Sequence, residues 1–525
     1  MPHKAIFQGV QEQRHEKICL SPCHVAVARS SIQVWGRTIH FNRAICTNEG
    51  LLVESEDGRN DMKKDMIVIG LGPAGMAVSA MGSAMGFDVL AVEKHKIGGE
   101  CLNYGCIPSK ALLKSAYARQ VIREAEKYGL NRVEVPDARN PFTRVQSHLT
   151  YINEEKTVKM FDKVDLLVGY EARFVDKYTV SVNGTNYRAK NIYICTGTRP
   201  AIPPIEGIDA VDYVTNEHLF HLDKLPESLF IIGGGAVGCE MAQAFARLGT
   251  RVVMAHMDPH LLPPADPQAA ALLEETLIGE GVEVYNSASI RSVHQEEGEC
   301  VVETDTGRFR AEKLLVAAGR KPVIHSLGLD AAGVRYNNKG IETDDYGRTS
   351  VKHIWAVGDC NGKFMLTHAA MHQGMLALMN SILPLKLRIS SFVVPWSVFT
   401  EPEVAHVGMT EDALKKRHVR HEVITVRYGD YGRAITDEKP NGFVKVCAGR
   451  WGKIYGVTIV GESASEIIHE YVLAMHKKVR LHDIMLMQHS FPSIALLNKR
   501  IAEEWMMRKM KKPAIKKILR FLYRL

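Results

Sequence analysis

Two cysteines five positions apart are the most informative feature of the sequence. Cys101 and Cys106 lie in the segment GGECLNYGCIPSK, residues 98–110, and a helix-forming stretch follows directly. Such a pair can close a small disulfide ring at a helix N-terminus, where the helix dipole stabilises a thiolate and lowers the pKa of the thiol. The spacing therefore predicts a reactive, oxidisable dithiol. The alternatives are two buried cysteines, or half of a zinc site for which no second Cys/His pair lies nearby.

Two glycine-rich turns each follow an apolar strand and open a helix. The glycines are Gly70, Gly72 and Gly75 in the first turn and Gly233, Gly235 and Gly238 in the second. Glycines let the backbone approach a pyrophosphate, and the helix N-terminus favours its charge. Glu93, which ends the next strand 18 residues after the first turn, is placed to accept ribose hydroxyls. The pattern predicts two bound dinucleotides, against the alternative of two structural strand–helix turns.

The second turn lacks the usual carboxylate. Its next strand, RVVMAHM, places His256 where an acid would hold a nicotinamide ribose. A carboxylate there would repel a 2′-phosphate, whereas His256 and nearby Arg251 or His260 would not. The sequence therefore favours NADPH over NADH, with both cofactors retained as candidates.

The elements that position these residues alternate along the chain. Short Val/Ile-rich strands and helical stretches follow one another from Met66, which predicts βαβ units and a parallel sheet. The length of 525 residues corresponds to roughly three or four domains. The composition excludes a disordered, fibrous or small disulfide-stapled protein, and no apolar run is long enough to span a membrane. We expect a soluble, cytoplasmic, multidomain protein.

The positive charge belongs to the C-terminal tail. Formal charge is +7, but residues 499–525 carry ten Lys and Arg against two Glu, so the body is nearly neutral and general nucleic-acid binding is excluded. Apolar residues recur at helical spacing opposite the basic ones. They are Ile515, Ile518, Leu519, Leu522 and Leu525, opposite Lys516, Lys517, Arg520 and Arg524. Residues 513–525 thus predict a basic amphipathic helix, which either contacts an anionic membrane or a partner, or packs on the protein body.

The first 61 residues show no convincing helical or strand periodicity. They contain several potential metal ligands, namely His3, His15, His24, His40, Cys19, Cys23 and Cys46. We favour a translation start placed too far upstream, because Met62 resembles a natural first residue. A targeting peptide is second, although no apolar core with a cleavage site is visible. A metal-binding arm is least favoured, because the spacing matches no standard zinc pattern, and no metal site is predicted.

The cysteine segment resembles the active-site signature of the class I pyridine nucleotide–disulfide oxidoreductases, the family of dihydrolipoamide dehydrogenase, glutathione reductase and mercuric reductase. The resemblance covers the chain from about Met66 to about Asn498. Further motifs occur in the family's order. They are TGTRP at 196–200, the second glycine turn with Glu240, GRKP at 319–322, HIWAVGDC with Asp359, LTHAAMHQG, and VPWSVFTEPEVAHVGMTE.

The resemblance implies an α/β fold with two Rossmann-like dinucleotide-binding domains and an α+β C-terminal dimerisation domain, assembled as a homodimer. It implies these domains: 62–212 FAD-binding, 213–329 NAD(P)-binding, 330–388 a return to the FAD domain, 389–500 dimerisation, and 501–525 the tail. Residues 1–61 remain an extension of unknown role.

The resemblance also implies the roles of individual residues. FAD is expected at the first glycine turn with Glu93, Thr196, Gly197 and Asp359, and NADPH or NADH at the second with His256 and Gly319. By position, Cys106 faces the flavin and Cys101 is the interchange thiol, while Lys110 and Glu240 form an ion pair beside the flavin. Electrons are expected to pass from NAD(P)H to FAD, then to the cysteine pair and a small acceptor, or in reverse, in support of cell redox homeostasis.

The sequence departs from disulfide-reducing members where a partner subunit supplies a His-Pro pair and a glutamate. Here Phe491 precedes Pro492, and Leu496 replaces the glutamate. Neither side chain can transfer a proton. His489, two residues away, is a weak candidate for a substitute base and otherwise an ordinary loop histidine.

This departure disfavours glutathione-like and lipoamide-like substrates. Mercuric reductase also has Phe-Pro here, and soft metal ions need two thiolates and no base. Yet mercuric reductase adds a tyrosine, where this chain has Ser493, and a C-terminal cysteine pair, whereas no cysteine follows Cys447. The expected function is mercuric-reductase-like reduction of a soft metal ion, persulfide or quinone. Dihydrolipoamide dehydrogenase is the alternative, and a non-turnover flavin redox sensor or membrane-docked partner subunit the second alternative.

Overall fold

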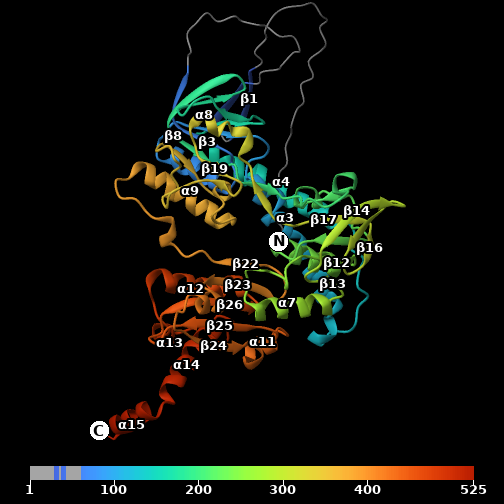
Figure 1. The fold of residues 1–525 in the computed structure, drawn as a ribbon, viewed down its shortest axis with the longest axis vertical. Helices are drawn as coiled ribbons and strands as arrows, with labels where there is room; N and C mark the ends of the chain where they lie inside the picture. Colours follow the sequence, from blue (N-terminus) through green and yellow to red (C-terminus); the bar gives the residue numbers. More distant parts are fainter. Residues whose placement is uncertain (1–28, 35–36, 43–60, 525) are drawn as a thin grey trace, which may run out of the picture. The chain divides into compact units, whose positions relative to one another are not determined.

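The computed structural model describes residues 29–34, 37–42 and 61–524 (Figure 1). In the extension it contains an antiparallel hairpin of β1 (Arg29–Val34) and β2 (Arg37–Asn42), in which Ile32 pairs with Ile39. No strand was expected in residues 1–61, and the hairpin corrects that expectation. Each strand has only two apolar residues alternating with polar ones, Ile32 and Val34 in β1 and Ile39 and Phe41 in β2. Two positions are too few to reveal the two-residue period of a strand. The remaining metal-ligand candidates, His3, His15, His24, Cys19, Cys23 and Cys46, lie outside the described residues.

A seven-stranded sheet carries the first glycine turn. Its order is β5-β4-β3-β8-β7-β6, with β21 also paired to β8, and β21, β8, β3, β4 and β5 are parallel to their neighbours in that series. The strands are β3 (Met62–Ile69), β4 (Val89–Glu93), β5 (Asp165–Val168), β6 (Ala172–Phe174), β7 (Thr179–Val182), β8 (Thr185–Ile194) and β21 (Ile354–Ala356). Because β21 joins β8 from far along the chain, the sheet is completed only after the second glycine turn has been passed.

A second, parallel sheet of five strands carries the second glycine turn. Its order is β10-β17-β11-β12-β13. The strands are β10 (Tyr213–Val214), β11 (Ser228–Ile232), β12 (Arg251–Ala255), β13 (Glu283–Tyr285) and β17 (Lys313–Val316). The parallel strands of the first, mixed sheet and the wholly parallel second sheet confirm the α/β class with two dinucleotide-binding folds that the alternating pattern predicted.

Smaller antiparallel pieces alternate along the chain with the strands of these two sheets. They are a three-stranded sheet of β14 (Ile290–Glu296), β15 (Glu299–Thr304) and β16 (Arg308–Ala311), a pair of β9 (Thr198–Pro200) and β18 (Arg320–Pro322), and a pair of β19 (Tyr336–Asn337) and β20 (Gly340–Ile341). The β9–β18 pair joins the segments that leave and re-enter the first sheet, so it ties the two dinucleotide-binding folds together.

The C-terminal part is built on an antiparallel five-stranded sheet. Its order is β22-β23-β26-β25-β24. The strands are β22 (Trp396–Val398), β23 (Glu403–Gly408), β24 (Glu422–Arg427), β25 (Phe443–Ala448) and β26 (Ile454–Gly461). Ile459 from this sheet shares a buried core with Tyr471 and Trp505 from the helices that follow it.

Helices cover the sheets. They are α1 (Pro73–Ala84), α2 (Gly99–Tyr104), α3 (Cys106–Arg123), α4 (Pro141–Ile152), α5 (Asn216–Leu219), α6 (Ala236–Leu248), α7 (Pro267–Gly279), α8 (Leu329–Ala332), α9 (Thr367–Ile382), α10 (Glu411–Lys416), α11 (Gly432–Thr436), α12 (Ala464–Lys477), α13 (Leu481–Leu486), α14 (Leu496–Met510) and α15 (Pro513–Tyr523). In one core, Leu112 of α3 is buried with Val145 of α4 and Phe245 of α6. This packing holds α3, which begins at Cys106, beside α6, the helix that follows the second glycine turn.

The tail forms a helix as predicted. Lys512 is extended, Pro513 occupies the first turn of α15, and the helix continues to Tyr523 without a buried residue (Figure 1). Leu525, which the sequence placed on the apolar face, lies outside the described residues. None of the helices in residues 61–524 combines the length and apolar composition that crossing a membrane requires.

Candidate active site

The two redox cysteines lie at a break between consecutive helices. Cys101 is in α2 and Cys106 is the first residue of α3, with Gly105 between the two helices. A Cβ on Gly105 would lie 3.2 Å from the carbonyl oxygen of Glu100, so glycine keeps this turn tight. Both thiols are free and half-buried, and Cys106 Sγ lies 3.3 Å from Thr367 Oγ1. The turn therefore brings together the pair that the spacing predicted.

The pKa values of the two thiols are shifted in opposite directions. A hydrogen bond from the Cys101 thiol lowers the pKa of Cys106 to about 6, against the effect of burial, and Thr367 and the Lys110 charge add to the lowering. The same hydrogen bond and burial raise the pKa of Cys101 above its usual value. At neutral pH Cys106 is therefore the thiolate and Cys101 the thiol. Which of the two thiols faces the flavin and which meets the substrate stays a prediction of the sequence resemblance.

Lys110 and Glu240 form an ion pair beside the cysteines, in which the Glu240 side chain is buried and the Lys110 side chain is 35% exposed. Lys110 Nζ lies 2.8 Å from Glu240 Oε2, and the ammonium lies 4.3 Å from the centre of the Phe399 ring. Glu240 also accepts a hydrogen bond of 3.0 Å from the backbone N–H of Phe399. Because the carboxylate is held from two sides, it fixes the ammonium near Cys106, where its positive charge favours the thiolate.

A polar chain that the sequence did not reveal runs from the cysteine helix to the Asp359 carboxylate. Arg320 bonds Glu100 and donates to Thr198 Oγ1 at 2.7 Å, and Thr198 Oγ1 donates to Asp359 Oδ2 at 3.0 Å. Asn216 donates to Glu100 at 3.0 Å. Burial raises the pKa values of both carboxyl groups against the lowering effect of Arg320. Only the motif GRKP hinted at Arg320, and nothing in the spacing linked it to Glu100.

The first glycine turn has the geometry of a pyrophosphate cradle. Gly70 has a φ of +93°, and a Cβ there would lie 2.6 Å from the carbonyl oxygen of Cys195. A Cβ on Gly75 would lie 1.9 Å from the carbonyl oxygen of Gly70, so the helix packs directly on the turn. By contrast, a Cβ on Gly72 would meet no atom within 4 Å and would point into open space above the N-terminus of α1. A dinucleotide phosphate fits that space.

Glu93 lies against this turn. Its buried carboxylate accepts hydrogen bonds from the backbone N–H groups of Leu71 at 2.7 Å and His95 at 2.8 Å. Two backbone donors hold the carboxylate at the carboxyl end of β4, as ribose binding requires. Together with the half-buried Asp359 carboxylate, these residues fit the FAD that the sequence predicted.

The second turn repeats the same three relations. Gly233 has a φ of +121°, and its Cβ would lie 2.4 Å from the carbonyl oxygen of Ala317. A Cβ on Gly238 would lie 2.0 Å from the carbonyl oxygen of Gly233, and one on Gly235 would meet nothing within 4 Å. The second turn therefore also fits a dinucleotide.

His256 occupies the position of the missing carboxylate. A Cβ on Gly234 would lie 2.7 Å from the His256 ring, so the imidazole packs on the turn itself. His256 Nε2 lies 2.7 Å from Asn286 Oδ1, and Asn286 Nδ2 donates to Glu274 Oε1 at 2.7 Å. His256 Nδ1 is buried and has no partner among the described residues. The ring is thus positioned by a chain of two residues that the sequence did not indicate.

The remaining cofactor candidates lie at the β9–β18 connection. Thr196 Oγ1 donates to the Val323 carbonyl at 2.6 Å, and the Val323 N–H donates to the Gly197 carbonyl at 3.0 Å. The Gly319 carbonyl accepts from the Ala201 N–H at 2.9 Å. These three residues are therefore hydrogen-bonded to the segments on either side of the β9–β18 pair, through Val323 and Ala201.

His489 is held by an acid of its own domain. Its Nε2 lies 3.1 Å from Glu470 Oε1, and Asn498 donates to Glu470 Oε2 at 2.8 Å. The His489 side chain is 7% exposed, whereas Phe491 is 79% exposed. Among the described residues of one chain, neither His489 nor Phe491 bonds a thiol, and Leu496 begins α14. The loop thus presents Phe491, and keeps His489 inside.

Comparisons with known proteins agree with this geometry. Residues 64–374 match the model of the pyridine nucleotide-disulphide oxidoreductases, and residues 394–499 match the dimerisation domain of the same family. The chain is 32% identical to the dihydrolipoyl dehydrogenase of Bacillus subtilis over 424 residues, which is 78% of this chain and 92% of that protein. It is 33% identical to a mercuric reductase of Lysinibacillus sphaericus over 435 residues, 81% of this chain and 79% of the other.

A solved structure has the same fold. The HOCl-induced flavoprotein disulfide reductase RclA from Escherichia coli superimposes with a TM-score of 0.76 at 24% identity, over 84% of this chain and 99% of that one. Enzymes of the matched family bind FAD and use NAD(P)H. The chain therefore belongs to the pyridine nucleotide-disulphide oxidoreductases, as a flavoprotein disulfide oxidoreductase with a C-terminal dimerisation domain.

Proposed function

We propose that this enzyme uses NAD(P)H and FAD to keep the Cys101–Cys106 pair reduced, and that the dithiol reduces a small acceptor without a general base. The acceptor class is a soft metal ion, as in mercuric reductase, or a persulfide or quinone. The observation that carries this proposal is the exposed Phe491 side chain, which occupies the position where disulfide-reducing relatives have their histidine.

The argument rests on proton transfer. Thiol–disulfide exchange with an organic disulfide is efficient near neutral pH when a histidine moves the proton of the interchange thiol. The phenyl ring of Phe491 cannot do this, and the His489 ring is bonded to Glu470 and only 7% exposed. We therefore propose that His489 positions the loop that carries Phe491, and does not act as a base.

A soft metal ion removes the need for that base. Cys106 is already a thiolate at neutral pH, because its pKa is about 6. A metal ion that binds this thiolate displaces the proton of the adjacent Cys101 directly, since coordinated thiols are deprotonated. Bound FAD supplies the two-electron chemistry that restores the dithiol, and Lys110 and Glu240 hold charge beside Cys106 during that exchange.

Dihydrolipoamide dehydrogenase is the competing function, and relatives with that name favour it. The test is NAD⁺ reduction by dihydrolipoamide on FAD-loaded enzyme, from about pH 6 to about pH 10. Without a base, we expect slow turnover that only rises as the dihydrolipoamide thiols ionise and attack the Cys101–Cys106 disulfide. A fast reaction with a bell-shaped pH profile would show that a working base exists and would overturn the proposal.

We also propose that the enzyme prefers NADPH, because the neutral or positive ring of His256 does not repel a 2′-phosphate. Substituting His256→Glu places a carboxylate against Gly234 and should move the ratio of kcat/KM for NADPH over NADH toward NADH by at least about tenfold. His294→Glu, a change of the same type on exposed β14, should leave the ratio unaltered. An unchanged ratio in His256→Glu would remove this residue from cofactor selection.

The match of residues 394–499 to the family's dimerisation domain supports a homodimer. We propose that the dimer works in the cytoplasm. In it, the loop with Phe491 would meet the cysteine pair of the other subunit, as the family resemblance implies.

A further inference from the structure

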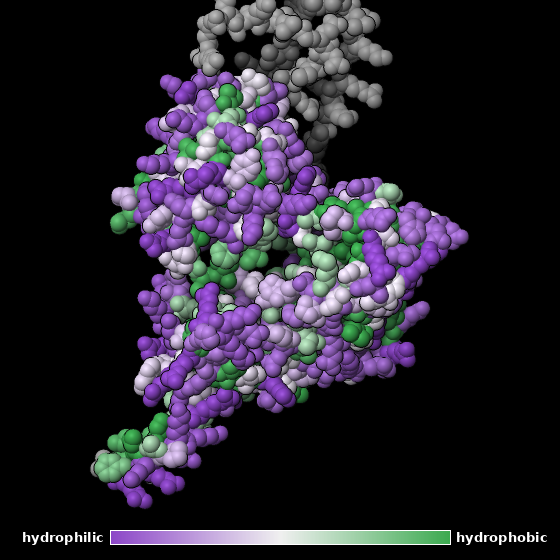
Figure 2. Space-filling model, viewed as in Figure 1, coloured by the Kyte–Doolittle hydropathy of each residue, from purple (hydrophilic) through white to green (hydrophobic). Residues whose placement is uncertain are grey.

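The helix α15 exposes an apolar face that no part of the described chain covers. Projected at 3.6 residues per turn, its aliphatic side chains fill an arc of roughly 100°, which two aromatic side chains widen to about 200°, and its basic side chains lie on the opposite side. The apolar residues are Ile515, Ile518, Leu519 and Leu522, bordered by Phe521 on one edge and Tyr523 on the other. Ile518 is 57%, Leu519 44% and Leu522 56% exposed. Figure 2 shows these hydrophobic side chains gathered over α15 beside a hydrophilic strip.

The charge around this face has a single sign. Between residues 505 and 525 the chain has eight Lys and Arg and no Asp or Glu. Within the part of the chain that the structure describes, six of these form no ion pair. They are Lys511, Lys512, Lys516, Lys517, Arg520 and Arg524. An apolar face flanked by uncompensated cations is complementary to a surface that is apolar below and anionic above.

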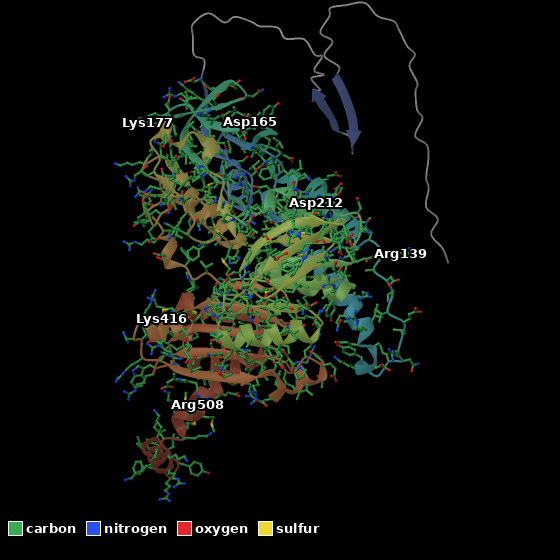
Figure 3. The ribbon with its side chains drawn as sticks, turned by 45° about the vertical axis from the view of Figure 1, so that its right-hand side comes forward. Arg139, Asp165, Lys177, Asp212, Lys416 and Arg508 are labelled. Atoms are coloured by element: carbon green, nitrogen blue, oxygen red, sulfur yellow. The ribbon has the colours of Figure 1, made fainter. Side chains whose placement is uncertain are left out.

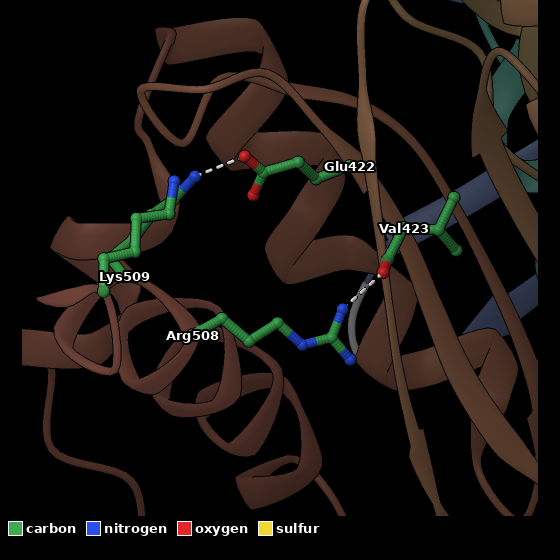
Figure 4. A pocket seen from close by; sticks show the side chains of 5 residues that line it. Glu422, Val423, Arg508 and Lys509 are labelled. Atoms are coloured by element: carbon green, nitrogen blue, oxygen red, sulfur yellow. Dashed lines mark hydrogen bonds and ion pairs between the residues drawn. The ribbon is translucent and has the colours of Figure 1, made fainter.

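The base of the helix is anchored to the body. There a recess of about 370 Å³ lies between α14 and β24 (Figure 4). Lys509 bonds Glu422 across it, and Arg508 donates to the Val423 carbonyl at 2.8 Å. Lys512 also lines the recess, just before Pro513 starts the new helix. Two contacts therefore fix the end of α14, while α15 beyond it remains free to bind something else.

We propose that α15 docks the enzyme on an anionic lipid surface, lying in the headgroup region with its apolar face toward the acyl chains. This goes beyond the proposed redox function and does not depend on it. In this pose the aromatic side chains at both edges of the apolar face would lie at the level of the headgroups, where tyrosine rings anchor proteins at membrane interfaces. A second copy of the tail is a poorer occupant, because pairing two apolar faces would bring the flanking cations of both helices together.

A lipid surface also explains why so short a segment is helical. A helix of 11 residues is marginal in water by itself, and burial of its apolar side chains at an interface stabilises it. In a homodimer the two copies of α15 would bind the same lipid surface, so that two weak attachments combine into a stronger one.

The test is flotation of the full-length, FAD-loaded enzyme with vesicles of phosphatidylcholine, with or without phosphatidylglycerol. We expect flotation only with the anionic vesicles, and a smaller bound fraction at high salt. Ile518→Ser/Leu522→Ser should lower the partition coefficient at least about tenfold. Lys516→Glu/Lys517→Glu should lower it similarly.

Matched variants on the body test whether position matters. Ile278→Ser/Leu385→Ser removes the same residue types from sites that are 53% and 83% exposed. Lys177→Glu/Lys416→Glu reverses two exposed charges that are distant from the tail in the sequence (Figure 3). Both should float like the unaltered enzyme, and turnover in solution should be the same for all four variants. Equal flotation of tail and body variants, equal binding to uncharged vesicles, or no flotation of the unaltered enzyme would each overturn the proposal.

Discussion

Cys101→Ser is expected to lower NAD(P)H-driven reduction of every acceptor by at least about a thousandfold, while NAD(P)H still bleaches the absorbance of the bound flavin. The reason is that a hydroxyl cannot form the disulfide with Cys106 through which two electrons reach the acceptor. General-base catalysis contributes about 10²–10⁴-fold, whereas loss of this sulfur removes the route of the electrons itself, so this is among the largest effects expected from a single substitution. Steady-state assays with each candidate acceptor measure the first effect, and anaerobic spectra the second.

The control is substitution of cysteines outside the site. Burial raises the pKa values of Cys300 and Cys447 to about 11, so both are inert thiols at neutral pH. Cys300→Ser and Cys447→Ser should retain full activity. Retained acceptor reduction in Cys101→Ser would mean that electrons leave by another route, and the dithiol mechanism would be wrong.

The acidity of Cys106 can be measured in the same variants. Thiolate is the reactive form, so alkylation of reduced Cys106 should rise with pH through about 6 and then level off. Because the hydrogen bond from position 101 is the main cause of the low pKa, Cys101→Ser, which keeps a donor, should leave this midpoint nearly unchanged. Cys101→Ala removes the donor and should raise it. A midpoint near that of an ordinary thiol in the unaltered enzyme would contradict the assigned polarity of the pair.

Sequence patterns predicted those parts of the site whose requirements are local. Gly75 has no room for a Cβ because the carbonyl of Gly70, only five residues earlier, lies against it. Both residues that create this steric requirement therefore belong to one short motif. The same holds for the two thiols at the ends of a single turn. Such motifs could therefore be recognised before any fold was known.

Contacts between distant segments could not be predicted in this way. Glu100 and Arg320 are 220 residues apart and meet only because β18 pairs with β9 beside the cysteine helix. Likewise, the chain from Glu274 through Asn286 to His256 depends on where α7 and β13 place their side chains. Residue type alone gives no partner for such groups, and several arginines and acids would have been equally plausible.

Whether His489 acts as a base could not be predicted from the sequence either. The sequence left it open as a substitute base, because a histidine two residues from the expected one is chemically able to transfer a proton. Its role depends on geometry: Glu470 on α12 bonds the His489 ring and is itself held by Asn498 on α14, so the His489 side chain lies inside while Phe491 is exposed. The proposal of a base-free acceptor therefore rests on which side chain this loop exposes, and substitution at that exposed position can supply the missing base.

Phe491→His combined with Leu496→Glu is expected to raise dihydrolipoamide oxidation near neutral pH by about a hundredfold. The first change restores an imidazole at the exposed position before Pro492, and the second supplies a carboxylate five residues later to orient it, as in the disulfide-reducing relatives. General-base catalysis contributes about 10²–10⁴-fold, and an introduced base recovers the lower part of that range. The gain should follow a bell-shaped pH profile, because the imidazole must be neutral to accept the proton of the thiol.

Two controls separate the base from the loop. Phe491→Leu removes the aromatic ring without adding a base, and Ser490→His adds a histidine one position away from the exposed site; neither should show the gain. His489→Gln in the double variant should reduce the gain only as far as it loosens the loop, leaving the pH of the optimum in place. If the double variant oxidises dihydrolipoamide no faster than the unaltered enzyme, the missing histidine is not what limits this substrate, and the specificity must lie in how the acceptor reaches Cys101.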